Sequence, residues 1–270
     1  MRVNSHEQIA FSTNRSQRNA TGIEKSLQKL SSGLKIAKGS DNASGLAISE
    51  TMRTQIKGLS QAQRNMQDGL SLLESTNEGL INVNNLLQRS RELAVMNANG
   101  TLTDNDRATS VKELVQLQAA IDDTADKMQF NTKNILGENK TLILQVGANP
   151  SDQLHITLVD MSTKALGLEN ATLVSREDAE ALITKIDDAV KKVTSHLTTI
   201  GSDMGAIEHH LRNAMLYETN LTGSLSLLED TDVAKEMMNF ISGDIRQKGD
   251  HLLINQVNQN RQGVLNLLTK

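Results

Sequence analysis

Two long stretches of the chain carry apolar residues at alternating spacings of four and three residues. The first covers residues 52–94 and the second covers residues 179–228. This heptad spacing predicts two long helices, each of which buries one seam along a partner. At about 1.5 Å per residue, rods of roughly 75 Å are typical of scaffolding rather than of an enzyme cleft. The pattern therefore predicts a protein that assembles.

The first ladder has thirteen positions, of which nine are apolar. Its members are Met52, Ile56, Leu59, Gln63, Met66, Leu70, Leu73, Asn77, Leu80, Asn84, Leu87, Arg91 and Ala94. The second ladder consists of Ala179, Leu182, Ile186, Ala189, Val193, Leu197, Ile200, Met204, Ile207, Leu211, Ala214, Glu218, Leu221, Leu225 and Leu228. We expect both sets to lie on buried helix seams.

Shorter signals lie beside and between the two ladders. Residues 5–30 predict a helix of modest amphipathicity, which ends at the serine and glycine residues 31–33. Thr103 and Asp106 have the spacing of a capping box that opens a shorter helix. Residues 141–146 and 153–158 are strand-like, and the turn residues between them favour a β-hairpin.

Several helix ends carry residues with known capping preferences. Asp41 is a candidate N-cap for the first long helix. That helix is expected to end near residues 97–100, where Asn and Gly suit a left-handed C-terminal cap. Asp230 and Thr231 are candidates to cap the final helix, whose apolar C-terminal turn would aggregate if left bare. We therefore expect a partner to cover that turn.

Composition narrows the class of protein. The 270 residues include three Phe, one Tyr and no Trp, whereas a compact globule usually fills its core with aromatic side chains. The absence of cysteine excludes disulfides, thiol catalysis and thiolate metal sites. No apolar run approaches the ~20 residues of a membrane span, and the N-terminus lacks the apolar core of a signal peptide. We expect no membrane partner.

The charge distribution is uneven. A net charge of −4 does not suggest a nucleic-acid binder. The first forty residues are nevertheless basic, with Glu7 and Glu24 as their only acidic residues. Such an arm either binds phosphate or forms a polar helix face, and the absence of interleaved aromatic residues favours the helix face.

No residue pattern marks a catalytic, metal or cofactor site. His209 and His210 are adjacent, so on a helix they point about 100° apart and cannot chelate one metal from one face. The glycines of residues 39–45 lack the Gly-Lys-Ser/Thr ending of a phosphate-binding loop. No spacing indicates a nucleophile elbow or a triad. We expect neither an enzyme nor a cofactor.

Motifs at both ends of the chain resemble the signatures of bacterial flagellin. The matching segments are residues 30–36 (LSSGLKI), 40–49 (SDNASGLAIS), 67–69 (QDG), 87–94 (LQRSRELA), 230–237 (DTDVAKEM) and 262–265 (QGVL). The resemblance covers both ends and the hairpin between them, in the same order. It implies a mainly α fold: an elongated, antiparallel, coiled-coil-like bundle of long helices, with a short β-hairpin and paired terminal helices.

The resemblance also implies a domain organisation and partners. Residues 1–40 and 231–270 would form the inner-tube domain, and residues 41–230 would form the surrounding shell domain with the hairpin. The chain would leave the cell unfolded through the flagellar type III export apparatus, without a cleaved Sec signal peptide, and join an extracellular filament. Its partners would be copies of itself, an export chaperone, and the hook-associated and filament-cap proteins. Large variable outer domains are not expected, because only about residues 131–176 separate the helical halves.

The resemblance and the apolar pattern together suggest contact residues. The candidate subunit interface consists of Leu27, Leu30, Met237, Ile241, Leu253, Val257, Val264 and Leu268. By resemblance, Arg89, Leu93 and Glu113 match a patch that contacts the host innate receptor TLR5 in many flagellins. Packing against a neighbouring subunit is an alternative role for these three residues, and the two roles are compatible.

Two other structural proteins compete with a filament subunit. A hook–filament junction protein would share the terminal helices and the export route, but such proteins usually carry a proline directly after the acidic pair, where this chain has Ala43. A non-flagellar coiled-coil adaptor would explain the heptads, but not the glycine-serine breaks or the C-terminal signature. The sequence therefore favours a flagellin.

Overall fold

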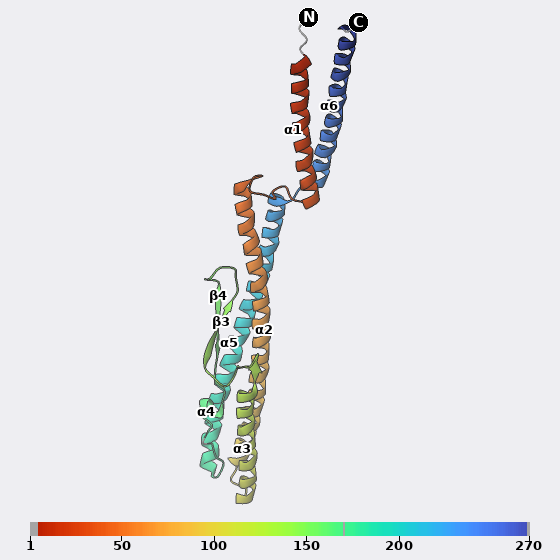
Figure 1. Cartoon of the computed structure of the whole chain (residues 1–270). Coiled ribbons are helices and arrows are strands. Elements are labelled where there is room, and N and C mark those ends of the chain that lie inside the picture. The colour runs from red at the N-terminus through yellow and green to blue at the C-terminus, as the bar shows by residue number, and fades with distance from the viewer. Residues whose placement is uncertain (1–4, 170, 269–270) are drawn as a thin grey trace. The chain divides into compact units, whose positions relative to one another are not determined.

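The computed structural model describes residues 5–169 and 171–268, and gives only the main chain of residues 5, 6, 8, 9, 260, 261 and 264–268. The fold is mainly α-helical (Figure 1). Its elements are α1 (Ser5–Ser32), α2 (Ala43–Asn97), α3 (Asp104–Lys127), β1 (Gln129–Phe130), β2 (Lys133–Asn134), β3 (Lys140–Gln145), β4 (Gln153–Leu158), α4 (Thr163–Leu166), α5 (Arg176–Glu229) and α6 (Val233–Leu268).

The chain forms two compact units. One unit comprises Met1–Thr54 and Asn220–Lys270, and the other comprises Gln55–Thr219. The long helices α2 and α5 each contribute residues to both units.

In the unit Gln55–Thr219, α2 and α5 run antiparallel. Gln63 Nε2 on α2 donates to Glu218 Oε2 on α5 at 2.6 Å, and Arg91 Nε on α2 donates to Asp187 Oδ1 on α5 at 2.7 Å. The later α2 residue therefore meets the earlier α5 residue. This confirms the predicted antiparallel packing of the two long helices.

Besides Leu72, Gly79 and Leu93, the buried positions of α2 in the unit Gln55–Thr219 form two rows, of which the heptad pattern predicts one. The predicted row, in which successive members are seven residues apart, is buried: Leu59, Met66, Leu73, Leu80, Leu87 and Ala94. The alternate positions of the ladder, from Ile56 to Arg91, are instead half-buried or exposed. A second buried row lies three residues after the first and consists of small or polar residues: Ala62, Gly69, Thr76, Val83, Ser90 and Asn97.

The polar members of this second row donate hydrogen bonds within the helix itself, although Asn97 Oδ1 has no partner among the described residues. The Thr76 hydroxyl donates to the carbonyl of Leu72 at 2.8 Å, and the Ser90 hydroxyl donates to the carbonyl of Leu86 at 2.9 Å. Asn97 Nδ2 donates to the buried carbonyl of Leu93 at 2.8 Å. Bonds of this kind remove most of the desolvation cost of burying a polar side chain. Small polar residues can therefore occupy a packed seam.

The ladder on α5 is confirmed over most of its length. Its first row is buried at Ala179, Ile186, Val193, Ile200, Ile207 and Ala214. From Glu218 onwards the ladder positions are half-buried. The apolar seam of α5 thus supplies its core mainly to the unit Gln55–Thr219.

The predicted hairpin is present as β3 and β4, which pair antiparallel from Lys140 opposite Leu158 to Gln145 opposite Gln153. Its tip lies against α2, because a Cβ added at Gly58 would be 2.9 Å from the Cβ of Ala148. The strand pair β1–β2 and the helix α4 were not expected, since elements of two to four residues show no periodicity.

Three cap predictions need correction, and one is confirmed. The N-cap of α2 is Asn42 rather than Asp41, because Asn42 Oδ1 accepts from the Gly45 N–H at 2.9 Å. The N-cap of α6 is Asp232, whose Oδ1 accepts from the Lys235 N–H at 3.1 Å. Adjacent acidic and amide residues compete for such ends, so spacing alone does not choose among them. The capping box at Thr103 is confirmed.

The left-handed cap predicted for the end of α2 is also wrong. No residue of 97–100 has a positive φ. The guanidinium of Arg107 instead donates to the carbonyl oxygens of Asn97 at 2.6 Å and Asn99 at 3.1 Å. A side chain from α3 therefore supplies the donors that the helix end lacks.

In the unit of residues 1–54 and 220–270, the segment between α1 and α2 is hydrogen-bonded to the segment at the end of α5. Gly33, with φ of +73°, accepts at its carbonyl from the Thr231 N–H at 2.8 Å. The Lys35 N–H donates to the carbonyl of Glu229 at 2.6 Å. Arg53 Nη2 binds both oxygens of the buried Glu229 carboxylate, at 2.7 and 2.6 Å. This network ties the start of α2 to the end of α5.

We predict that two glycines of the unit Gln55–Thr219 respond oppositely to alanine. Gly201→Ala should raise the thermal midpoint by about 2–4 °C, because an exposed helix position with open space gains about 0.5–1 kcal/mol. Gly58→Ala should lower it, because the new Cβ displaces the hairpin tip at Ala148. Calorimetry of both variants checks this, and an equal rise in both would contradict the close contact.

Candidate assembly surface

The terminal helices α1 and α6 lie side by side as an antiparallel pair (Figure 1). A Cβ added at Gly243 of α6 would be 2.9 Å from Ile23 Cγ1 of α1, so glycine allows the helices to approach closely here. Nearby, a hydrogen bond from the buried Ser26 lowers the pKa of Glu236. The contact face of the pair is therefore narrow and partly polar.

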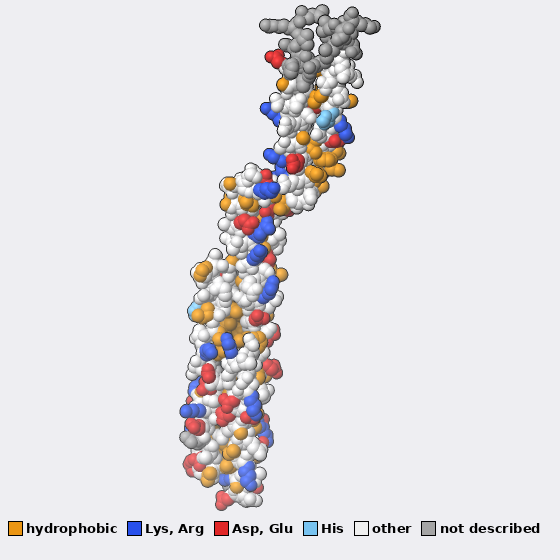
Figure 2. All heavy atoms as spheres, in the orientation of Figure 1, with side chains coloured by type: hydrophobic (Ala, Val, Ile, Leu, Met, Phe, Trp, Pro, Cys, Tyr) orange, Lys and Arg blue, Asp and Glu red, His pale blue; other side chains and the backbone are white. Residues whose placement is uncertain are grey.

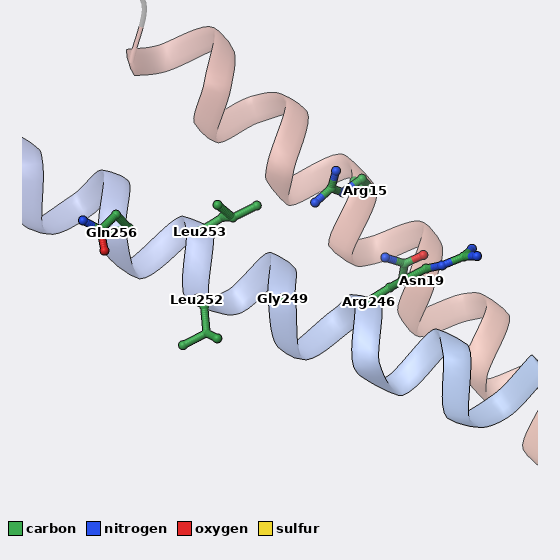
Figure 3. A pocket seen from close by; sticks show the side chains of 7 residues that line it. All are labelled: Arg15, Asn19, Arg246, Gly249, Leu252, Leu253 and Gln256. Atoms are coloured by element: carbon green, nitrogen blue, oxygen red, sulfur yellow. The ribbon is translucent and has the colours of Figure 1, made fainter.

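A buried carboxylate lies at the centre of this contact. The side chain of Asp250 on α6 is 0% exposed and is paired with Arg15 of α1. Arg15 Nε donates to Asp250 Oδ1 at 2.6 Å, and Asn19 Nδ2 donates to Oδ2 at 2.7 Å. These hydrogen bonds, that from Arg15 first, hold the pKa of Asp250 below its usual value. Figure 3 shows Arg15 and Asn19 on the stretch of α1 that lies along this part of α6.

Many large apolar side chains of the pair are exposed. Among the side chains that the structure describes, the fully buried apolar ones run from Ile36 to Ala214, so α1 and α6 contribute none. Phe11 is 68% exposed and Leu252 is 70% exposed. The exposed set on the pair is Phe11, Leu27, Val233, Met237, Met238, Ile241, Ile245, Leu252 and Leu253.

Part of this set forms a stripe on α6 that is interrupted by Lys248. Met238, Ile241, Ile245 and Leu252 recur at spacings of three, four and seven residues, which places them on one helix face. We call these four residues the α6 stripe. In Figure 3, Leu252 points away from α1, whereas its neighbour Leu253 points towards α1. Figure 2 shows apolar side chains gathered on the surface of this part of the chain.

Two grooves lie along the pair. One of about 820 Å³ is lined by Arg15, Asn19, Arg246, Gly249, Leu252, Leu253 and Gln256 (Figure 3). The other, of about 500 Å³, is lined by Glu7, Phe11, Ser12, Leu253 and Val257. Leu253 lines both grooves. Apolar side chains of a neighbouring molecule would find apolar walls in either one.

The predicted interface residues fall into three groups. Leu27, Met237, Ile241 and Leu253 are exposed, while Leu30 and Val257 are half-buried. The side chains of Val264 and Leu268 lie outside the described residues. Sequence reasoning left out Phe11, Met238, Ile245 and Leu252, although the helical period of the last three along α6 was a usable signal.

The structure brings together two of the three residues of the predicted receptor patch. Arg89 Nη2 on α2 lies 2.8 Å from Glu113 Oε1 on α3, and Arg89 also pairs with Glu92 at 2.8 Å. Leu93 is only 2% exposed and belongs to the core beneath this surface. The exposed part of the patch is therefore a network of charged side chains.

Long heptad helices and a terminal pair with uncovered apolar side chains define a helical structural protein. The chain matches the family models of the bacterial flagellin N-terminal helical region, over residues 4–141, and of the bacterial flagellin C-terminal helical region, over residues 183–268. The chain therefore belongs to the bacterial flagellin family.

Similar proteins cover nearly the whole chain. A flagellin of Halalkalibacterium halodurans is 38% identical over 98% of this chain and 96% of its own length, and a flagellin of Bacillus subtilis is 34% identical over 99% and 100%. The crystal structure of Bacillus cereus flagellin, 34% identical, matches with a TM-score of 0.50 over 56% of this chain and 88% of that chain. A putative flagellar hook-associated protein from Vibrio parahaemolyticus, 15% identical, shares the fold with a TM-score of 0.59 over 70% and 99%.

These matches establish the biological role. The chain is a structural subunit of the bacterial flagellar filament, and neither the junction protein nor the coiled-coil adaptor is favoured. In the described part of the chain, no helix combines the length and the apolar character that a membrane crossing requires.

We predict that acid weakens the α1–α6 pair through Asp250. Because its folded pKa is lowered, its stabilising contribution is present above the unfolded value of 3.8 and is lost as the pH falls below that value. Asp250→Asn should open the pair already at neutral pH and flatten this part of the pH dependence. Hydrogen exchange of α6 amides measures the opening.

The control for this prediction is Asp244→Asn. Asp244 forms an exposed pair with Lys248 on the same helix, and such pairs contribute little. Equal effects of the two substitutions would show that the buried position of Asp250 is unimportant.

Proposed function

We propose that the exposed apolar side chains of α1 and α6 are the contacts through which subunits polymerise. The observation that carries this proposal is that the pair buries a carboxylate while nine of its large apolar residues are exposed. A helix pair of this kind gains little stability alone, since helices in proteins draw most of their stability from packing of an apolar face. Neighbouring subunits would supply that packing.

The size of the effect fits polymerisation. Full burial of a Leu, Ile, Met or Phe side chain is worth about 1.5–3 kcal/mol. The α6 stripe alone offers four such residues, and Phe11, Leu27 and Leu253 offer more. We include Leu30, Met237, Val257, Val264 and Leu268 in the same interface.

The domain assignment belongs to the same proposal. Residues 1–40 and 231–270 would form the inner tube of the filament, and residues 41–230 would form the shell around it. The grooves along α1 and α6 support this assignment, because a tube wall needs neighbouring helices to fill such spaces. Hook-associated and filament-cap proteins would meet the same surfaces at the two ends of the filament.

The exposed α6 stripe also supports a proposal about secretion. We propose that a chaperone covers α6 inside the cell, and that the chain then leaves unfolded through the flagellar type III export apparatus without a cleaved Sec signal peptide. Contiguous exposed apolar residues are an aggregation hazard before assembly, which gives a chaperone a physical purpose. The role is structural and not enzymatic, and no cofactor or nucleic acid takes part.

The host receptor TLR5 is a further proposed partner, through Arg89 and Glu113. Both side chains are partly exposed and come from different helices, so they present a fixed pair of opposite charges. Leu93 would support the patch from the core rather than touch the receptor. Arg is common among the residues that dominate binding energy at protein interfaces.

We predict that Leu252→Gln impairs polymerisation while leaving the monomer intact. The substitution keeps the size of the side chain but removes its apolar surface, at a position 70% exposed in the single chain. The critical concentration should rise about tenfold or more, since losing about 1.5 kcal/mol per contact corresponds to that factor. Sedimentation of filaments measures it.

Leu252→Met is the matched control, because a volume-conserving apolar change is well tolerated. It should polymerise close to the wild-type concentration. A wild-type critical concentration for Leu252→Gln would show that Leu252 is not an assembly contact.

We predict that Arg89→Ala raises the concentration of monomer needed for half-maximal TLR5 signalling about tenfold, as expected for loss of a contact worth about 1.4 kcal/mol. A reporter-cell assay measures it, with the thermal midpoint as a check of folding. Arg176→Ala is the control, because Arg176 forms a comparable exposed pair with Glu180 on α5. Unchanged signalling by Arg89→Ala would remove Arg89 from the proposed contact.

A further inference from the structure

The turn between α2 and α3 contains an Asn-Gly dipeptide, whose side-chain chemistry is independent of filament assembly. Asn99 and Gly100 form the single Asn-Gly dipeptide of the chain. Both residues are exposed and lie outside any helix or strand. A backbone in a turn can change its φ and ψ angles far more easily than one held in a helix.

The local geometry favours reaction between these two residues. Asn99 Oδ1 accepts from the Thr101 N–H at 3.3 Å, which folds the side-chain amide back over the Gly100 backbone and polarises its carbonyl. Within the described residues, the Gly100 N–H donates no hydrogen bond. A Cβ added at Gly100 would meet nothing within 4 Å, so the attacking nitrogen is unobstructed.

We propose that Asn99 is a site of spontaneous deamidation. The Gly100 nitrogen loses its proton and forms a bond to Asn99 Cγ, while the bond from Cγ to the amide nitrogen breaks and ammonia leaves with a proton. The product is a five-membered succinimide. Water then opens the ring, giving aspartate when the bond from Cγ to nitrogen breaks and isoaspartate when the bond from the main-chain carbonyl carbon to nitrogen breaks.

Other positions in the chain lack one or more of these conditions. Asn131 lies in a turn but is followed by the β-branched Thr132, whose side chain hinders attack by its nitrogen. Asp68 precedes Gly69, but both lie within α2, and Gly69 is buried. Asn131 therefore serves as an internal control for the rate at Asn99.

Deamidation would act on the cap of α2. Arg107 binds the carbonyl oxygens of Asn97 and Asn99, and isoaspartate inserts an additional methylene group into the main chain between them and α3. In isoaspartate the carbonyl of residue 99 becomes a free carboxylate, and this carboxylate competes with the Asn97 carbonyl for the guanidinium. The modification would thus loosen the α2–α3 turn as a filament ages.

The test is incubation of the purified full-length protein in mildly alkaline buffer, followed by peptide mapping. We expect the peptide of Asn99 to gain one mass unit at least about ten times faster than that of Asn131, with isoaspartate detected by an isoaspartate-specific methyltransferase. Gly100→Ala should slow the reaction by about an order of magnitude, because a Cβ hinders the attacking nitrogen and restricts its backbone. That variant should keep the fold, since the position has open space and no positive φ.

A second variant separates charge from chain length. Asn99→Asp carries the new charge without the additional methylene group, so it should lower the thermal midpoint less than aged wild-type protein rich in isoaspartate. Equal rates at Asn99 and Asn131, or an unchanged rate in Gly100→Ala, would overturn the proposal.

Discussion

The buried ion pair between Arg15 and Asp250 is the constraint on which the proposed assembly surface depends. It fixes which face of α6 meets α1, namely the face of Gly243 and Asp250, where large apolar residues such as Phe240 and Ile254 are half-buried. The α6 stripe must then lie outside. Under the proposed assembly contact, a neighbour that binds only the folded pair would stabilise it by mass action, which would link folding of the terminal helices to growth of the filament.

In the unit Gln55–Thr219, close packing is achieved by contacts within the chain itself. On α2, small residues make room for neighbours: Gly58 meets Ala148 of the hairpin, Gly69 meets Leu144, and Gly79 meets Leu136. Side chains of the chain itself thus fill this core, which contains nearly all the buried apolar residues of the described chain. Under the proposed assembly contact, a subunit would combine a part with its own apolar core and a part whose apolar residues are covered by copies of itself.

Much of this architecture was predictable because its signals are local and periodic. The leucine row of α2, most of the ladder of α5, the β-hairpin and the capping box at Thr103 follow from local sequence patterns. The second row of α2 was missed because Thr76, Ser90 and Asn97 look like surface residues in a sequence. Asp250 was missed for the same reason, since only the structure shows that Arg15 and Asn19 enclose it. The sequence predicts that the terminal helices present apolar residues to a partner, but it does not predict which face of α6 carries them.

In the terminal pair, a polar contact can set the alignment of the two helices while apolar side chains drive association. Apolar contacts are non-directional, so two apolar helices can slide past one another with little change in energy. A buried carboxylate with defined donors loses its hydrogen bonds on any such shift. Setting the register of two helices in this way is the best-attested use of a buried ion pair. In this chain Asp250 would set the register of α1 against α6. The α6 stripe can then supply the driving force for association without having to specify the alignment of the pair it belongs to.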